Sequence, residues 1–173
     1  MIEAEADIIG CNGTHIYVMP DMLSAEQCDY FIREFDHIWK MQTIVEYPLW
    51  AKKIWEFTAD KFKDSWFVNF KKQRKFQIVG FKDTVTVSKC RAKLNRHLDN
   101  QTTGAEFKLF FYLTQHAKDA GTNFFDTQEN KVEIKNQLGA CVLFDISLEH
   151  ESQPIPHGDL KISMGVRPII QYA

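Results

Sequence analysis

The sequence contains no apolar run close to the roughly 20 residues that a membrane-spanning helix requires. It also lacks the opening of a secretory signal, because residues 1–7 are acidic where such a signal would be basic and then apolar. Both absences argue against membrane insertion and secretion. We therefore expect a soluble, cytoplasmic protein with no membrane partner.

Cysteine is scarce, and neither sign of charge dominates. Cys11, Cys28, Cys90 and Cys141 are widely spaced and form no Cys-x-x-Cys pair, which favours buried free thiols over a zinc knuckle or a redox couple. The formal net charge of -2 excludes a global attraction to nucleic acid or anionic membranes. A local basic patch has to be sought by position.

The composition favours one folded domain with a sheet-rich core. The 173 residues are 45% hydrophobic, which is enough to bury a core within a single domain, 1–173. Fourteen phenylalanines dominate the aromatic content, and aromatic side chains are enriched in strands.

Hydrophobic periodicity divides the chain into a helical first part and a sheet-rich second part. After a strand at 14–19, Ser24 resembles an N-cap, and apolar residues recur at helical spacing from 25 to about 40. A second helix is predicted at 48–63, with proline in its first turn. Further strands are predicted at 66–70, 75–81, 84–89, 105–113, 123–126, 131–134, 139–146 and 160–172. This order predicts an α+β, mainly β protein whose helices back one sheet of a sandwich or barrel.

One short segment offers metal ligands. His97 and Asp99 are two residues apart, and in extended backbone such side chains project from the same face. Because His-x-Asp alone is more often a polar loop, a third ligand is needed. His150 follows the apolar strand expected at 139–146, so a rigid element can present it. The remaining histidines are interpreted as strand, helix-surface, turn or loop residues: His15, His37, His116 and His157.

Two imidazoles and one carboxylate on one ion leave three coordination positions open, as in Fe(II) oxygenases. Zinc would normally prefer four filled tetrahedral positions. The predicted metal ligands, and catalytic residues, are therefore His97, Asp99 and His150 around Fe(II).

Further motifs surround this triad in a recognisable order. They are Ile16-Tyr17-Val18, the segment 22–28, His97-Leu98-Asp99, the segments 120–125 and 139–144, His150, Pro154-Ile155 and Gly158-Asp159-Leu160-Lys161. In these motifs the chain resembles the 2-oxoglutarate/Fe(II) dioxygenase superfamily, and within it most closely the prolyl 4-hydroxylase type. The resemblance covers almost the whole chain.

The resemblance implies a double-stranded β-helix, a jelly-roll-like core backed by the N-terminal helices. It implies Fe(II), with 2-oxoglutarate and O2 as co-substrates and ascorbate as an auxiliary reductant. Oxidative decarboxylation of 2-oxoglutarate to succinate and CO2 would accompany hydroxylation of a substrate.

The resemblance also implies residues that bind 2-oxoglutarate. Lys161 resembles the family's basic partner for the far carboxylate, although it lies one residue further from the last histidine, and Tyr112 resembles the partner hydroxyl. If strand 105–113 is regular, Lys108 shares a face with Tyr112 and is a second candidate for the cation.

The sequence is compatible with several classes of substrate. Two basic runs, at 71–75 and 89–96, hint at an anionic substrate, although each run alone is more often a solvated face. The motif series favours hydroxylation of a protein or peptide side chain such as proline. The alternatives are a nucleic-acid demethylase of the alkylation-repair type, because Lys161 and Arg167 are six apart on the last strand, and a small metabolite hydroxylase. The non-enzymatic hypothesis is a non-catalytic binding module with a β-sandwich fold.

Overall fold

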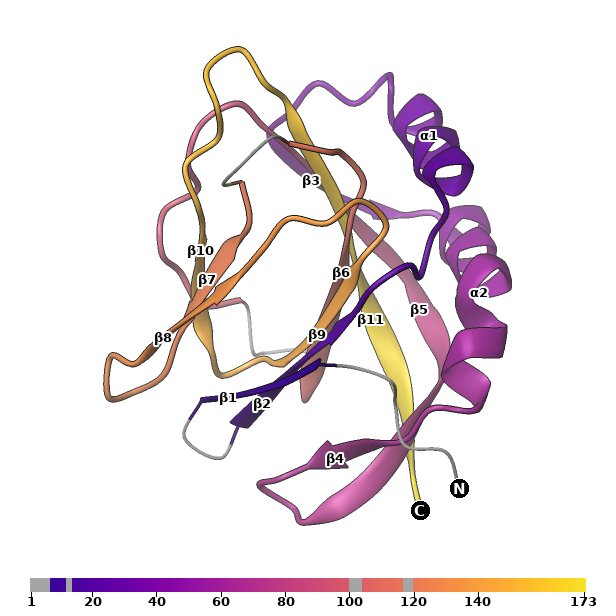
Figure 1. Ribbon diagram of the computed structural model, residues 1–173. Helices are drawn as coiled ribbons and strands as arrows, with labels where there is room; N and C mark the ends of the chain where they lie inside the picture. Colours follow the sequence, from indigo (N-terminus) through magenta and orange to yellow (C-terminus); the bar gives the residue numbers. More distant parts are fainter. Residues whose placement is uncertain (1–6, 12–13, 100–103, 117–119) are drawn as a thin grey trace.

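Two antiparallel sheets lie opposite each other in the computed structural model, which describes residues 7–11, 14–99, 104–116 and 120–173 (Figure 1). The larger, eight-stranded sheet has the order β1 (Asp7–Cys11), β2 (Thr14–Met19), β9 (Cys141–Asp145), β6 (Phe107–Tyr112), β11 (Lys161–Tyr172), β5 (Arg74–Cys90) and β3 (Gln42–Glu46), with β4 (Phe67–Asn69) paired to β5. The smaller sheet has the order β10 (Glu149–Ser152), β7 (Thr122–Phe125) and β8 (Lys131–Ile134). The expected mainly β, jelly-roll-like architecture is confirmed.

Two helices, α1 (Ala25–Glu34) and α2 (Pro48–Lys63), cover the outer face of the larger sheet (Figure 1). The side chain of Ser24 accepts a hydrogen bond from the backbone of Gln27, which caps α1 as its sequence predicts. Phe31, Ile54 and Phe62 are fully buried and join the helices to the main core. In the described part of the chain, no helix is both long and apolar enough to cross a membrane.

The largest differences from the sequence-based boundaries concern the first helix and strand β5. The first helix ends at Glu34, not near residue 40, although Ile38 stays buried because the chain turns back toward the core. β5 also runs without a break, because the exposed Lys82 and Asp83 continue the strand that the pattern divided. Strand β3, which was not predicted, follows α1 and pairs along the edge of β5.

Alternation along the strands separates a packed face of the larger sheet from a pocket face. On β5, Val85 and Val87 point toward the helices and are fully buried in the main core. Thr84, Thr86 and Ser88 point the other way and line a pocket between the two sheets. Packing against the main core therefore holds the larger sheet in place. The opposite face of the sheet carries the side chains that line the pocket.

Candidate metal centre and adjoining pocket

The triad residues lie on two segments that meet through their backbones. His150 is on β10, and His97 lies in the segment that follows β5. The amide of His97 donates to the carbonyl of His150 at 2.9 Å, and the reverse bond is 3.0 Å. Main-chain hydrogen bonds therefore place the two imidazoles side by side, with ring centroids 4.4 Å apart.

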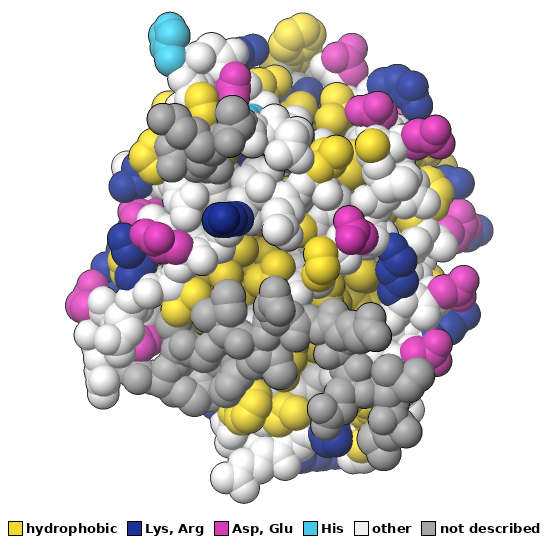
Figure 2. Space-filling view, in the orientation of Figure 1, with side chains coloured by type: hydrophobic (Ala, Val, Ile, Leu, Met, Phe, Trp, Pro, Cys, Tyr) yellow, Lys and Arg dark blue, Asp and Glu magenta, His cyan; other side chains and the backbone are white. Residues whose placement is uncertain are grey.

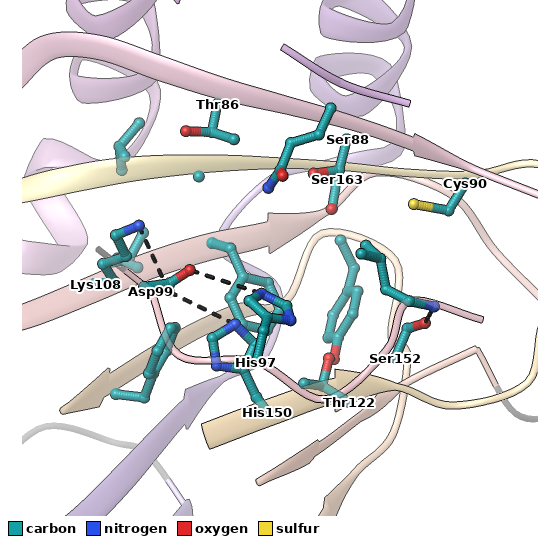
Figure 3. A pocket seen from close by; sticks show the side chains of 18 of the residues that line it. Thr86, Ser88, Cys90, His97, Asp99, Lys108, Thr122, His150, Ser152 and Ser163 are labelled. Carbon is teal, nitrogen blue, oxygen red and sulfur yellow. Dashed lines mark hydrogen bonds and ion pairs between the residues drawn. The ribbon is translucent and has the colours of Figure 1, made fainter. Parts of the chain in front are cut away.

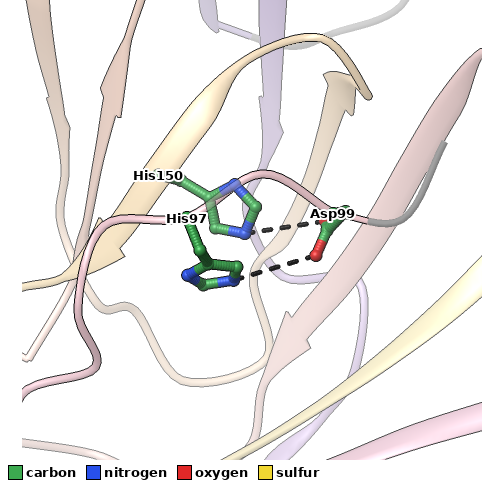
Figure 4. Close-up of side chains that lie close together, drawn as sticks. All are labelled: His97, Asp99 and His150. Atoms are coloured by element: carbon green, nitrogen blue, oxygen red, sulfur yellow. Dashed lines mark ion pairs between the residues drawn. The ribbon is translucent and has the colours of Figure 1, made fainter.

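The carboxylate of Asp99 faces both imidazoles from one side (Figure 4). Its oxygens are 3.8 Å from Nε2 of His97 and 3.6 Å from Nε2 of His150. One ligand atom from each residue lies within 4.8 Å of the others. The structure thus brings together the three residues that the sequence predicts as metal ligands.

The imidazole rings of His97 and His150 are each oriented by a contact of Nδ1 with a backbone carbonyl. Nδ1 of His97 is 2.8 Å from the carbonyl oxygen of Asn95, and Nδ1 of His150 is 3.3 Å from that of Leu148. Since a carbonyl only accepts, Nδ1 carries the proton in the neutral form of each ring, and Nε2 then presents a lone pair toward the centre. Burial lowers the pKa of His150, the Asp99 carboxylate opposes that shift, and His97 adds to it. The neutral imidazole is the form that binds metal.

A cavity of about 130 Å³ adjoins the triad (Figure 3). Thr86, Ser88 and Ser163 lie across it from the triad, on β5 and β11. Sequence reasoning missed this polar wall. Its signal was present in the alternation of threonine and serine with valine along β5.

Lys161, at the start of β11, is buried at one end of this cavity. Its Nζ donates to the carbonyl of Gly121 at 3.1 Å and lies 5.3 Å from the centre of the Tyr112 ring. It forms no ion pair with a carboxylate of the described residues. Burial lowers the pKa of Lys161 to about 8, because the ammonium loses its hydration and no carboxylate of the described residues compensates its charge.

Tyr112 is fully buried on β6, beside Lys161. Its hydroxyl lies 2.7 Å from Oγ1 of Thr122, a β7 residue on the opposite sheet. Burial raises the pKa of Tyr112, so the phenol stays neutral at physiological pH. A neutral hydroxyl and a buried cation together suit a carboxylate ligand.

Lys108 lies elsewhere in the pocket. Its Nζ is 3.5 Å from Oδ2 of Asp99, and the side chain extends from β6 toward the triad (Figure 3). It does share a face with Tyr112, as the regular strand predicted, but it contacts the carboxylate of the triad. Of the two candidate lysines, only Lys161 lies at the end of the pocket near Tyr112.

The basic residues directly before the triad pair mainly within the protein. Arg96 contacts the carboxylates of Glu129 and Glu149, and Lys93 pairs with Glu151 at 3.2 Å. These contacts join the His97 segment to the smaller sheet. This run therefore contributes to positioning the triad.

The second basic run lies in the β4–β5 hairpin and also pairs with carboxylates of the protein. Lys71 contacts Asp145 at 3.2 Å, and Lys72 contacts Glu106 at 2.7 Å. On the face shown in Figure 2, side chains of both charges are intermixed. The two runs therefore do not account for an anionic substrate.

His116, which the sequence analysis interprets as a turn residue, is held by side-chain contacts. It is buried, and its Nδ1 lies 2.9 Å from a carboxylate oxygen of Asp159, which precedes Leu160 and β11. Its Nε2 is 2.9 Å from the hydroxyl of Thr114. These contacts hold together the loops that flank β6 and β11.

The fold is similar to that of solved prolyl hydroxylases and of an α-ketoglutarate-dependent epimerase, which confirms the resemblance at the level of fold. No protein-family model matches the sequence, and no curated protein matches it either. Solved structures do match.

Three of these structures illustrate the class. The viral collagen prolyl hydroxylase of Paramecium bursaria Chlorella virus-1, solved with 2-oxoglutarate, has a TM-score of 0.59 at 19% identity and covers 92% of this chain and 97% of that chain. A Trichoplax adhaerens prolyl hydroxylase, solved with a hypoxia inducible factor peptide, has a TM-score of 0.60 at 11% identity over 91% and 84%. A non-haem α-ketoglutarate-dependent epimerase from nogalamycin biosynthesis has a TM-score of 0.63 at 11% identity over 92% and 81%.

Proposed function

We propose that the protein is a 2-oxoglutarate- and O2-dependent Fe(II) hydroxylase. The observation that carries the proposal is the triad His97, Asp99 and His150, whose ligand atoms lie within 4.8 Å beside a pocket with a buried lysine. The fold of the three solved enzymes supports it.

The donor set fits Fe(II). Two imidazole nitrogens and one carboxylate oxygen would hold Fe(II) and would leave coordination positions open for a chelating co-substrate and for O2. Bound iron would supply the oxidative chemistry that couples decarboxylation of 2-oxoglutarate to substrate hydroxylation. The protein's own part is to hold the ligands in the correct tautomer through the carbonyls of Asn95 and Leu148.

We assign the far carboxylate of 2-oxoglutarate to Lys161. Its Nζ is a buried cation without a carboxylate partner in the described chain, and a co-substrate carboxylate would supply the missing charge. Tyr112 and Thr122 line the same end of the pocket, and whichever hydroxyl accepts the hydrogen bond between them would be free to donate to that carboxylate. Lys108 is already paired with Asp99, so it is a poor alternative.

A protein or peptide side chain such as proline is the favoured substrate. Two of the solved enzymes with this fold are prolyl hydroxylases, and one of them holds a peptide. The epimerase with the same fold indicates that a small molecule is the alternative.

Succinate formation from 2-oxoglutarate in Fe(II)-supplemented protein tests the activity. We expect slow turnover without substrate, and its loss in a His97→Ala, Asp99→Ala double variant. The bonds between residues 97 and 150 are main-chain bonds, so this variant retains them. The matched control is Asp36→Ala, His37→Ala, which removes the same groups from an exposed turn. Equal succinate formation in the wild type and the triad variant would favour a non-catalytic binding module.

A further inference from the structure

Arg167 has no role in the proposed chemistry, yet it lines the pocket. Lys161, Ser163, Gly165 and Arg167 alternate along β11 on the face that borders the cavity. The intervening Ile162, Met164 and Val166 are buried in the main core. The strand therefore directs a second cation into the same pocket as Lys161, six residues away, or roughly 20 Å along the strand.

The register of β6 and β11 places this second cation beside Lys108. Ser163 pairs with Tyr112, and Val166 pairs with Leu109. The ladder ends at this last pair, which Arg167 follows on β11 and Lys108 precedes on β6, and both side chains line the pocket. Because Lys108 contacts Asp99, Arg167 lies at the level of the metal triad, at the opposite end of the ladder from Lys161 and Tyr112.

Lys108 and Arg167 differ in whether an acidic side chain neutralises their charge. Lys108 pairs with Asp99 at 3.5 Å, whereas the guanidinium of Arg167 forms no ion pair or hydrogen bond with any residue of the described chain. Like charges on directly opposite strand positions destabilise a sheet. A guanidinium that faces a pocket beside another cation, without an acidic partner, is a site for an anion.

The chemistry of the surrounding wall fits a polar anionic group. Thr84 and Thr86 on β5 add hydroxyls to this part of the pocket, and Gly165, which pairs with Thr86, adds little bulk. A guanidinium binds a carboxylate through two parallel hydrogen bonds, which fixes orientation as well as position. A carboxylate held here would bring the attached carbon skeleton next to the triad.

We infer that the substrate carries a carboxylate that Arg167 binds beside the metal triad. The inference rests on the proposed oxygenase function and narrows its substrate class. The carboxylate has two sources, an acidic side chain within a peptide or the α-carboxylate of an amino acid derivative. Both present the same group to Arg167.

Two matched pairs of probe mixtures separate these sources. The first pair is acetyl-Gly-Xaa-Asp-Gly-amide and acetyl-Gly-Xaa-Asn-Gly-amide, where Xaa is an equimolar mixture of amino acids. The second pair is N-acetyl amino acids and their amides. Succinate formed above the uncoupled rate, and oxygen incorporation detected by mass spectrometry, are measured with each mixture.

In one or both pairs, we expect the carboxylate member to stimulate turnover more than its neutral partner. Arg167→Gln should lower this preference by about tenfold or more, because it removes a charged hydrogen bond. Arg33→Gln, the same change at an exposed position on α1, should leave the preference intact. The Tm of Arg167→Gln should equal or exceed that of the wild type, because the change removes repulsion from Lys108.

The outcomes separate the inference from the proposed function. No succinate in the absence of any probe would overturn the oxygenase function, and the inference with it. Uncoupled turnover without preference for either carboxylate member, or a preference that survives Arg167→Gln, would overturn the inference alone. Arg167-dependent, salt-sensitive binding of a single-stranded oligonucleotide without any carboxylate preference would also overturn it, in favour of a phosphate ligand.

Discussion

At the scale of the residue, the chemistry of the pocket depends on the protonation of Lys161. Burial lowers its pKa to about 8, against an ordinary value of 10.5, because the ammonium loses hydration without gaining an anion. The charged form binds a carboxylate and the neutral amine does not. The co-substrate site should therefore respond to pH on the alkaline side of neutrality.

We predict that the dissociation constant of 2-oxoglutarate, measured on Mn(II)-loaded protein without O2, is constant below pH 8 and rises above it. Above the pKa of the free protein, binding must take up a proton, so affinity falls by up to about tenfold per pH unit. In Lys161→Arg the cation stays charged, and this alkaline weakening should disappear. A pH-independent affinity in the wild type would exclude Lys161 as the partner of the carboxylate.

At the scale of the element, Gly139 lies in the turn that precedes β9. Its φ is +77°, and a Cβ there would lie 2.0 Å from the carbonyl oxygen of Leu23. That carbonyl belongs to the turn before α1, and the amide of Leu23 donates to Gly139 at 3.1 Å. Helix α1 and strand β9 are therefore held together through a position that only glycine fits.

Gly139→Ala should lower the free energy of unfolding by about 2–4 kcal/mol, from positive-φ strain and the backbone clash together. Gly158→Ala is the control, because its φ is +85° and a Cβ there would meet nothing within 4 Å. It should cost only about 1–2 kcal/mol, the strain alone. Equal losses in urea unfolding would mean that the contact with Leu23 does not constrain the fold.

Helix α2 should contribute to stability chiefly through its buried face. Ile54→Ala removes a fully buried side chain of the main core and should cost about 2–5 kcal/mol. Ile44→Ala makes the same change on β3, where the side chain is 69% exposed, and should change stability by less than about 0.5 kcal/mol. Similar losses in thermal unfolding would contradict the placement of α2 against the sheet.

Some helices and strands can be predicted from the sequence because their local residue pattern is sufficient to determine them. Helix α2 begins at Pro48 and ends at Lys63 as predicted, since its apolar period is long and its first residue favours a helix start. Strand β8 also has its predicted bounds. Strand β10 was missed because Glu-His-Glu-Ser has no apolar alternation, and pairing with β7 forms it. Strand β3 likewise forms through its partner β5.

The candidate site was predictable to a similar extent. His97 and Asp99 could be grouped from their spacing alone, and His150 from its place after an apolar strand. The choice between Lys161 and Lys108 could not be made, because both satisfy strand alternation and only the register between strands separates their surroundings. Arg167 was noted for its spacing from Lys161, but its position beside Lys108 is a tertiary property.

At the scale of the whole molecule, metal binding should stabilise the fold, because the triad joins β10 of the smaller sheet to the segment that leaves the larger one. A divalent ion at a hundred times its dissociation constant adds about 2.7 kcal/mol of stability. For a chain of this size we expect Tm to rise by about 5–10 °C with Mn(II). The increase should be absent in the His97→Ala, Asp99→Ala variant, and an equal increase there would place the metal elsewhere.

The central claim is that one iron ion, held by three side chains, accepts 2-oxoglutarate as a chelating ligand in the positions left open. The most direct test is visible absorption of Fe(II)-loaded protein under anaerobic conditions as 2-oxoglutarate is added. We predict a charge-transfer band that saturates at one 2-oxoglutarate per protein and is absent from the His97→Ala, Asp99→Ala variant. Iron binding to the wild-type triad without any such band would contradict the account.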